Sequence, residues 1–442
     1  MTHLRFPLFG FLLCVSLVAV AQEPGTLDLE TVAALATRDA PSLVGLRRTL
    51  DNAADELGWG AYRDDLSLSL SGSLDGDDLA ALTRKGSATL EAGVEVLPQL
   101  TITGKLIGQL EEPEPARPPE ELSGSVGLTV RPLADSHGRE RDRIAYDRAL
   151  LALESEARGL AFTAVTKLLD AVTARTDLEI AEADAEVAER SLASTEALAE
   201  RDRATDTEVE AARDTVRAAR QTRERRALAA ERARWSLASA IGLEPEAFAL
   251  PDWEELALEA SVADIRDAGR PLEPGELASA TQAVRAAELD VRSAQVELAA
   301  THRFTPELSA GASVNLPGPS YSLSLGLTVS PADWDGSAKD EAEEDVRLAE
   351  RDAEATRTGD AYDARAALLD LEIAIEEVEA ELIDLALAEQ AVAEARFRFD
   401  RGDVTALALA QSELALGKAQ VAVNAARASV VRQWYSIDLG QY

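Results

Sequence analysis

Two stretches of the sequence, SVGLTVRPLADSHG (residues 125–138) and SLGLTVSPADWDG (residues 324–336), follow the same design. In each, apolar and polar residues alternate, the alternation stops near a proline, and a long charged, alanine-rich segment follows. Leu128 and Leu327 hold the same place in the two stretches and are 199 positions apart. A pattern repeated at this distance suggests that the chain contains two copies of one unit.

A nearly constant offset continues along the chain. Asp202 and Asp400 begin two similar segments 198 positions apart, and Gly242 and Gly440 close the two halves at the same spacing. We therefore predict an internal duplication. The expected organisation is a first repeat over residues 22–242, a Pro- and Glu-rich linker over residues 243–273, and a second repeat over residues 274–442.

The first 21 residues have the pattern of a secretory signal peptide. Arg5 supplies a positive start, residues 6–20 are apolar, and Ala19 and Ala21 are the small residues of a cleavage site. Cys14 is the only cysteine and lies inside this segment, so the mature chain is expected to contain no thiol. No later segment has the ~18 uninterrupted apolar residues of a membrane helix. The sequence predicts an exported protein.

Each half has the same expected order of elements: a helix, alternating strands, a very long helix, a short break and a last helix. The expected helices cover residues 27–62, 138–198 and 207–240 in the first half, and 274–303, 337–398 and 405–437 in the second. At 1.5 Å per residue the longest would span roughly 90 Å, more than a compact domain can hold. Periodicity alone would favour an ordinary coiled coil.

The strands point away from an ordinary coiled coil. Residues 66–71, 122–130, 308–316 and 321–329 alternate between apolar residues and Ser, Thr or Gly. Segments of about ten residues with this alternation are typical of outer-membrane strands, although a half-exposed soluble sheet has the same pattern. Aromatic residues at the helix–strand junctions favour the membrane, because amphipathic rings gather at its interface. These residues are Trp59, Tyr62, Phe304 and Trp334.

The first half contains an extra hairpin. Residues 88–96 and 100–108 alternate as well, joined by Pro98 and Gln99, which gives six strands per chain. Six strands cannot close a membrane barrel, and an open edge in lipid would leave backbone groups unpaired. We therefore expect three copies to share one barrel of eighteen strands, with the helices forming a tunnel by the same symmetry. The competing outcome is a hairpin outside the wall, with four strands per chain in it.

The sequence resembles the outer-membrane efflux (TolC) family over nearly all of its mature length. The resemblance rests on the duplicated plan, on PSLVGLRRTLDNAADELG (41–58), and on the aromatic, Gly, Gln and Leu-Gly pattern of residues 396–440. It implies a mostly α, internally duplicated fold in which a trimeric membrane β-barrel continues into a long α-helical periplasmic barrel. Such a protein lies in the outer membrane and extends into the periplasm.

The resemblance also implies the function and the partners. The chain is expected to be the exit duct of a tripartite efflux or type I secretion system, working as a homotrimer in outer-membrane lipid. A periplasmic adaptor and an inner-membrane transporter would be its partners. The breaks between the long helices would form the periplasmic tip that docks the adaptor. In this sequence the tip residues are Arg203, Ala204, Thr205, Arg401, Gly402 and Asp403.

The family's closed tip uses residues that this sequence lacks. A Tyr three residues before the tip glycine and an Arg two after it are replaced by Phe399 and Val404. Aspartates six and nine residues after the glycine are replaced by Ala408 and Gln411. A different closure would need other ion pairs, and charges at helix ends are more often simply solvated. The candidates are Arg398, Arg401, Asp403, Asp206 and Glu210.

Other functions fit the composition less well. A net charge of −36 argues against a nucleic-acid partner. The three histidines show no catalytic or ligand spacing, so we expect no enzyme, no cofactor and no metal site. The alternatives are a periplasmic coiled-coil structural protein or adhesin without a pore, and a diffusion porin, which has no use for such long helices. The acidic excess suggests a cation-preferring pore, whereas the cargo and the class of pump stay open.

Overall fold

The computed structural model describes residues 27–38, 40–57, 66–75, 85–97, 100–111, 120–130, 137–269, 273–301, 304–316, 320–331 and 336–440. They form two compact units, each built from both halves of the chain. The sheet unit comprises Leu46–Ala152 and Arg285–Thr356. The helical unit comprises the chain up to Gly45, Leu153–Val284 and the chain from Arg357. The predicted signal peptide lies outside the described residues.

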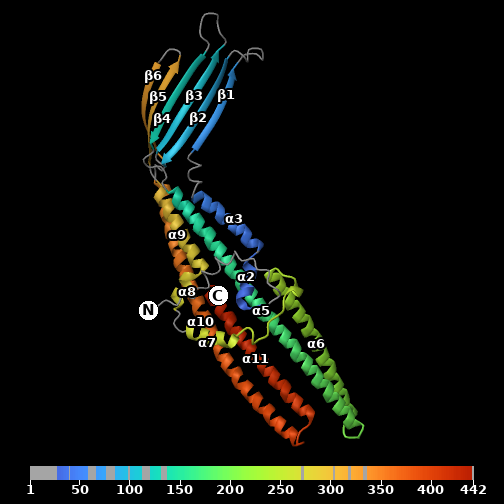
Figure 1. Cartoon of the computed structure of the whole chain (residues 1–442). Helices are drawn as coiled ribbons and strands as arrows, with labels where there is room; N and C mark the ends of the chain where they lie inside the picture. Colours follow the sequence, from blue (N-terminus) through green and yellow to red (C-terminus); the bar gives the residue numbers. More distant parts are fainter. Residues whose placement is uncertain are drawn as a thin grey trace. The chain divides into compact units, whose positions relative to one another are not determined.

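The sheet unit contains six antiparallel strands in chain order (Figure 1). The strands are β1 (Leu66–Asp75), β2 (Lys85–Leu97), β3 (Leu100–Glu111), β4 (Glu120–Val130), β5 (Phe304–Leu316) and β6 (Ser320–Pro331). The predicted extra hairpin, β2–β3, pairs with β1 on one side and β4 on the other. The prediction of six strands per chain is thus confirmed, and β4–β5 pairing joins the two halves.

The register divides the sheet into polar and apolar rows that cross all six strands. Because side chains alternate along every strand, an in-register row lies on one face of the sheet. One row is polar and consists of Ser69, Glu91, Lys105, Ser125, Ser313 and Ser322. The adjacent row is apolar or glycine and consists of Leu68, Ala92, Gly104, Val126, Ala312 and Leu323.

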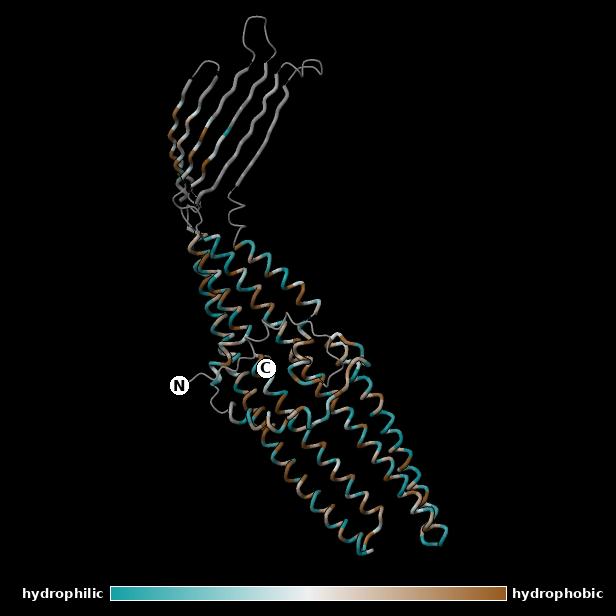
Figure 2. The backbone as a smooth tube through the Cα atoms, viewed as in Figure 1, coloured by the Kyte–Doolittle hydropathy of each residue, from teal (hydrophilic) through white to brown (hydrophobic). Residues whose placement is uncertain are grey.

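The apolar face of β6 is uncovered in the single chain. Leu323 and Leu325 are 87% and 78% exposed, and Leu327 and Val329 are also exposed. Figure 2 shows apolar residues recurring along this strand. Contiguous exposed apolar surface of this kind marks a site of contact with lipid or protein.

The long helices form as the sequence predicted. α5 (Gly138–Ala199) has 62 residues and α10 (Ser337–Asp400) has 64. α6 (Asp206–Ile241) and α11 (Ala406–Asp438) follow them after short turns. The chain contains few Gly and Pro residues in these ranges, so nothing interrupts the helical hydrogen bonds.

The two shorter helices are not continuous, and the prediction of single helices over 27–62 and 274–303 was wrong. The first is divided into α2 (Leu29–Arg38) and α3 (Pro41–Asp55), because Pro41 lacks an N–H and disfavours helical geometry before it. The second is divided into α8 (Pro274–Ala280) and α9 (Gln282–Ala300) at Thr281, whose ψ of 155° is extended. The Thr281 hydroxyl accepts the Val284 N–H at 3.3 Å and caps α9.

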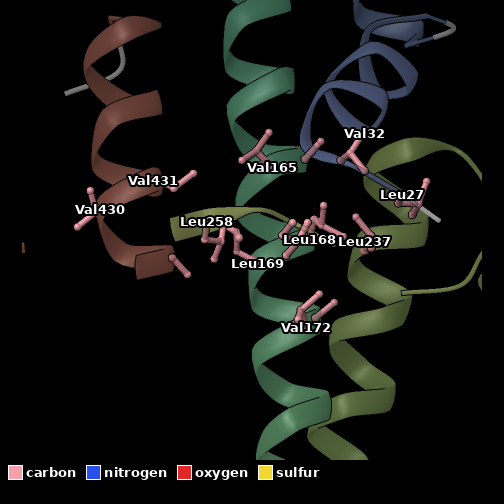
Figure 3. Close-up of a cluster of buried hydrophobic side chains, with 14 of the residues drawn as sticks. Leu27, Val32, Val165, Leu168, Leu169, Val172, Leu237, Leu258, Val430 and Val431 are labelled. Carbon is pink, nitrogen blue, oxygen red and sulfur yellow. The ribbon is translucent and has the colours of Figure 1, made fainter. Parts of the chain in front are cut away.

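The main core lies in the helical unit and draws on both halves (Figure 3). Leu168, Leu169 and Val172 of α5 are fully buried, and Leu237 of α6 and Val430 of α11 join them. α7 (Leu258–Gly269) contributes Leu258. Burying a side chain of this size is worth about 1.5–3 kcal/mol, so this cluster fixes the helices around α5.

The predicted linker is bound to the long helices. The Arg175 guanidinium donates to the carbonyls of Leu250 and Pro251 at 3.0 and 3.1 Å and to the Asp252 carboxylate at 2.8 Å. The Trp253 indole N–H donates to the Thr176 hydroxyl at 2.9 Å. These hydrogen bonds hold the linker across α5.

Candidate functional site: hairpin turns and exposed faces

The two turns between the long helices have the same backbone geometry. In the α5–α6 turn the Asp202 N–H donates to the Ala199 carbonyl at 2.9 Å and the Arg203 N–H to the Leu198 carbonyl at 2.9 Å. In the α10–α11 turn the corresponding bonds run from Gly402 to Phe399 and from Asp403 to Arg398, at 2.9 and 2.8 Å. Both are Schellman motifs, which need one residue in the left-handed region.

The residues in the left-handed region are Asp202 and Gly402, with φ of 54° and 75°. They are 200 positions apart, whereas the sequence alignment of this segment used 198. The equivalent residues of the two turns are therefore Asp202 and Gly402 and not Asp202 and Asp400, because the conformation of the turn defines equivalence. Sequence reasoning missed Asp202, although aspartate is one of the few residues that tolerate this conformation.

Threonine caps the helix after each turn. The Glu208 N–H donates to the Thr205 hydroxyl at 3.3 Å, and the Thr205 N–H donates to the Glu208 carboxylate at 2.7 Å, which forms a capping box. In the second turn the Ala408 N–H donates to the Thr405 hydroxyl at 3.2 Å. Ala408 has no carboxylate, so only half of the box is present there. The hydrogen bond from the Thr205 backbone lowers the pKa of Glu208.

The charges predicted to close the tip make local pairs in the single chain. Arg401 lies 3.4 Å from the Asp403 carboxylate, Arg398 pairs with Glu394 one turn away, and Glu210 pairs with Arg213 at 2.8 Å. Among the residues that the structure describes, no ion pair joins one turn to the other. The candidates of the two turns are therefore not brought together within one copy.

Aromatic residues are exposed beside the second turn. Phe397 is 61% exposed and Phe399 is 40% exposed, and the Arg401 guanidinium lies 5.4 Å from the centre of the Phe397 ring. Of the other predicted residues, Arg203, Asp206 and Gln411 are exposed, and Ala204, Val404 and Ala408 are half-buried. The second turn thus offers an apolar surface next to a cation.

α10 has two rows of apolar residues at heptad spacing. The buried row is Ala364, Ala367, Leu371, Ala374 and Val378. The exposed row, here called the outer seam, is Tyr362, Leu369, Ile373, Ile383 and Leu387. Tyr362 is 71% exposed and Ile383 is 64% exposed. Heptad seams pack against neighbouring helices, so α10 is built to contact helices on two sides.

Ion pairs define the lateral order of the four long helices in the helical unit. Arg220 of α6 pairs with Glu189 of α5 at 2.8 Å, and Lys418 of α11 pairs with Asp184 of α5 at 3.0 Å. Arg396 of α10 pairs with Glu413 of α11 at 2.9 Å. The order is α6, α5, α11, α10, as Figure 1 also shows. α6 and α10 are therefore the outer helices of this layer.

α6 also has exposed apolar residues. Leu228 is 68% exposed and Trp235 is 53% exposed. α6 carries eight arginines and six acidic residues, whereas α10 carries twenty acidic and seven basic residues. The two outer helices are thus complementary in charge as well as apolar.

The predicted interface aromatics are mostly not described by the structure. Trp59, Tyr62 and Trp334 lie outside the described residues, and Phe304 is the first residue of β5. Among the described helices, none is both long and apolar enough to cross a lipid bilayer. The described side chains include no cluster of three or more His, Cys, Asp or Glu placed to hold a metal ion.

Comparison with known proteins identifies the fold. No protein-family profile matches the chain, and no curated protein matches it by sequence. Among solved structures, the outer membrane protein VceC of Vibrio cholerae is 14% identical with a TM-score of 0.58, over 93% of this chain and 94% of VceC. CusC, described in connection with transmembrane channel formation, is 13% identical with a TM-score of 0.56, over 95% of this chain and 94% of CusC.

A third solved structure is that of the outer membrane channel MtrE of Neisseria gonorrhoeae in its open state. It is 15% identical with a TM-score of 0.52, over 93% of this chain and 88% of MtrE. The chain therefore has the TolC-like fold of these outer-membrane channels along almost its entire length, which confirms the predicted mostly α, TolC-like fold, whereas the trimer and the barrel stay predictions.

Proposed function

We propose that this protein is an outer-membrane channel that serves as the exit duct of a tripartite efflux or type I secretion system. The observation that carries the proposal is the six-stranded sheet, whose described apolar side chains on β4 and β6 are exposed and whose edge strands are β1 and β6. Exposing those apolar side chains to water would be unfavourable. Exposing the edges to lipid would leave backbone N–H and C=O groups without hydrogen bonds unless another copy pairs with them.

Closure by copies of the chain follows from the strand directions. Six antiparallel strands place β1 and β6 in opposite directions, so β6 of one copy can pair antiparallel with β1 of the next. Three copies would form a barrel of eighteen strands, a size that leaves an aqueous channel. The inserted hairpin then belongs to the wall, rather than lying outside it.

The helices support the same ring. None of the described helices covers the outer seam of α10, and the basic, partly apolar α6 forms the opposite flank. α6 of the next copy is the occupant that matches α10 in both apolar character and charge. Repetition of the order α6, α5, α11, α10 around a threefold axis would make a closed tunnel of twelve long helices.

The remaining roles follow from this arrangement. The signal peptide (1–21) directs export, and the repeats 22–242 and 274–442, joined by the linker 243–273, provide barrel and tunnel. The protein lies in the outer membrane, contacts lipid through the apolar rows and extends into the periplasm. A periplasmic adaptor docks at the two hairpin turns, and an inner-membrane transporter supplies the cargo. No catalysis is required of the chain.

The rival function is a periplasmic coiled-coil structural protein or adhesin without a pore. The outer seam of α10 would suit such a protein equally well. The uncovered leucines of β6 would not, because a soluble spacer gains nothing by exposing them. The sheet, not the helices, therefore separates the two functions.

Disulfide crosslinking tests the ring directly. The mature chain is expected to be free of cysteine, so pairs can be introduced without background. Cysteine at Leu228 or Trp235 of α6, combined with cysteine at Leu369, Ile383 or Leu387 of α10, should give covalent dimers and trimers in outer-membrane fractions. The matched control replaces Leu371 of the buried row, which is 3% exposed and should not crosslink between copies. A detergent-free monomer in the soluble fraction would refute the channel.

A further inference from the structure

The charged residues in the middle of the sheet come from the inserted hairpin alone. Among the described strands, Glu91 and Lys105 are the only charged residues with at least five strand residues on either side. Glu91 belongs to β2 and Lys105 to β3. The remaining charges of the strands lie nearer to strand ends, where water is close.

Strand pairing sets these two residues directly opposite each other. Glu91 is the register partner of Lys105 across the β2–β3 pair, and opposite charges at such positions stabilise a sheet. Lys105 is half-buried in the single chain. The in-register row continues through Ser125, Ser313 and Ser322, so the two charges stand in an otherwise neutral polar row.

The second half of the chain has no counterpart of these charges. Its strands β5 and β6 carry Ser, Thr, Gly and Asn at the polar positions of their central parts. The hairpin β2–β3 has therefore added both strands and charge to the duplicated plan. A polar row that already has serine at four places gains no solubility from a Lys–Glu pair, which suggests a role in the lumen.

We propose that Glu91 and Lys105 form a charged belt around the lumen of the barrel and set how the membrane part of the duct treats charged solutes. This inference rests on the proposed channel, in which a threefold axis would place three Glu–Lys pairs at one height. Rings of charged residues are the usual means by which pores discriminate ions. Each Glu–Lys pair is neutral, so the intact belt adds a local electric field without a net charge. Its expected solutes are small ions of either sign and dipolar molecules.

Single-channel recording of the full-length protein in planar bilayers tests the belt. Under a KCl gradient, Lys105→Gln should move the reversal potential toward cation preference and Glu91→Gln toward anion preference. A change in the permeability ratio of about twofold or more is expected for each, because three charges are unbalanced in one ring. The double variant should return to the wild-type ratio. Ser125→Gln, in the same row but neutral, is the matched control and should leave the ratio unchanged.

A second measurement avoids variants that fail to assemble. Lys105→Cys can be modified after assembly with a cationic or an anionic thiosulfonate, and the two reagents should shift the reversal potential in opposite directions. The belt would be refuted, and the channel retained, if the variants conduct but no charge change moves the reversal potential. The same holds if Glu91→Gln and Lys105→Gln move the reversal potential in the same direction. Absence of any conductance from the wild-type protein would overturn both.

Discussion

Asp202 and Gly402 occupy the same left-handed position in the turns that end α5 and α10, with φ of 54° and 75°. In the α5–α6 turn an L-residue, Asp202, adopts this conformation at a cost in free energy, whereas in the α10–α11 turn Gly402 adopts it freely. The turns are otherwise alike in their hydrogen bonds and threonine caps. The difference can therefore be measured by exchanging a single residue.

Asp202→Gly should stabilise the α5–α6 turn by about 1 kcal/mol, and Gly402→Ala should destabilise the α10–α11 turn by a similar amount. Thermal unfolding of the detergent-solubilised protein measures both. Gly359 is a useful control, because it lies within α10 with open space around its Cα. There the same Gly→Ala change should stabilise by roughly 0.5–1 kcal/mol. Equal effects at Gly359 and Gly402 would contradict the assigned turn.

The capping box makes the start of α6 sensitive to acid. The pKa of Glu208 is lowered in the folded protein, so its ionised form is the one that stabilises. Its contribution is complete above the unfolded pKa near 4.5 and is lost as the pH falls through the lower folded pKa. The protection of the amides at the start of α6 against hydrogen exchange, corrected for the intrinsic rate at each pH, should therefore fall in this range. Glu208→Gln should remove that pH dependence, and Thr205→Ala should cost about 1 kcal/mol at neutral pH.

Asp438 should behave in the opposite way. Burial at the end of α11 raises its pKa above 3.8, and the nearby Arg158 only partly offsets this. The folded state thus favours the protonated acid, so stability falls as the pH rises from the unfolded pKa through the folded one. Asp438→Asn should raise the melting temperature at neutral pH and have little effect in acid. A lower melting temperature at neutral pH would show that the electrostatic attraction of Arg158 outweighs the cost of burial.

Core and seam leucines should separate folding from assembly. Leu168→Ala removes a fully buried side chain of α5 and should cost about 2–5 kcal/mol of folding stability. Leu369→Ala, on the outer seam of α10, removes an exposed side chain and should leave the helical content of the chain unchanged. Its expected effect is a weaker trimer, measured by mass photometry in detergent. An intact trimer after Leu369→Asp would indicate that another face of α10 meets the next copy.

Much of the fold could be predicted because its signals are local. Alternation with a period of two located β1 to β6, and unbroken apolar periodicity located α5 and α10 to within two residues of their ends. The first helices were predicted less well. Pro41 is a helix-breaking residue, but the apolar periodicity continues across it, so a single helix was predicted. Thr281 gives no strong signal in the sequence, because a threonine within a helical pattern becomes a cap only when its neighbours fix an extended ψ.

The candidate site could be predicted only in part. The positions of the two turns between the long helices followed from the sequence. The left-handed Asp202, the exposed Phe397 and the outer seam of α10 did not, since each depends on which side of a helix the rest of the chain covers. Ion-pair candidates such as Arg398 and Glu210 found partners in their own helices, which residue type alone cannot reveal.

By itself, the sequence determined the six strands, the four long helices and their order, because those depend on spacings along one strand or one helix. The tertiary structure alone decided that Glu91 and Lys105 are register partners on the neighbouring strands β2 and β3, and that Tyr362 is exposed while Leu371 is buried. Register and burial depend on contacts between different strands and helices. A shift of one strand by one residue, or a rotation of one helix, would change these contacts.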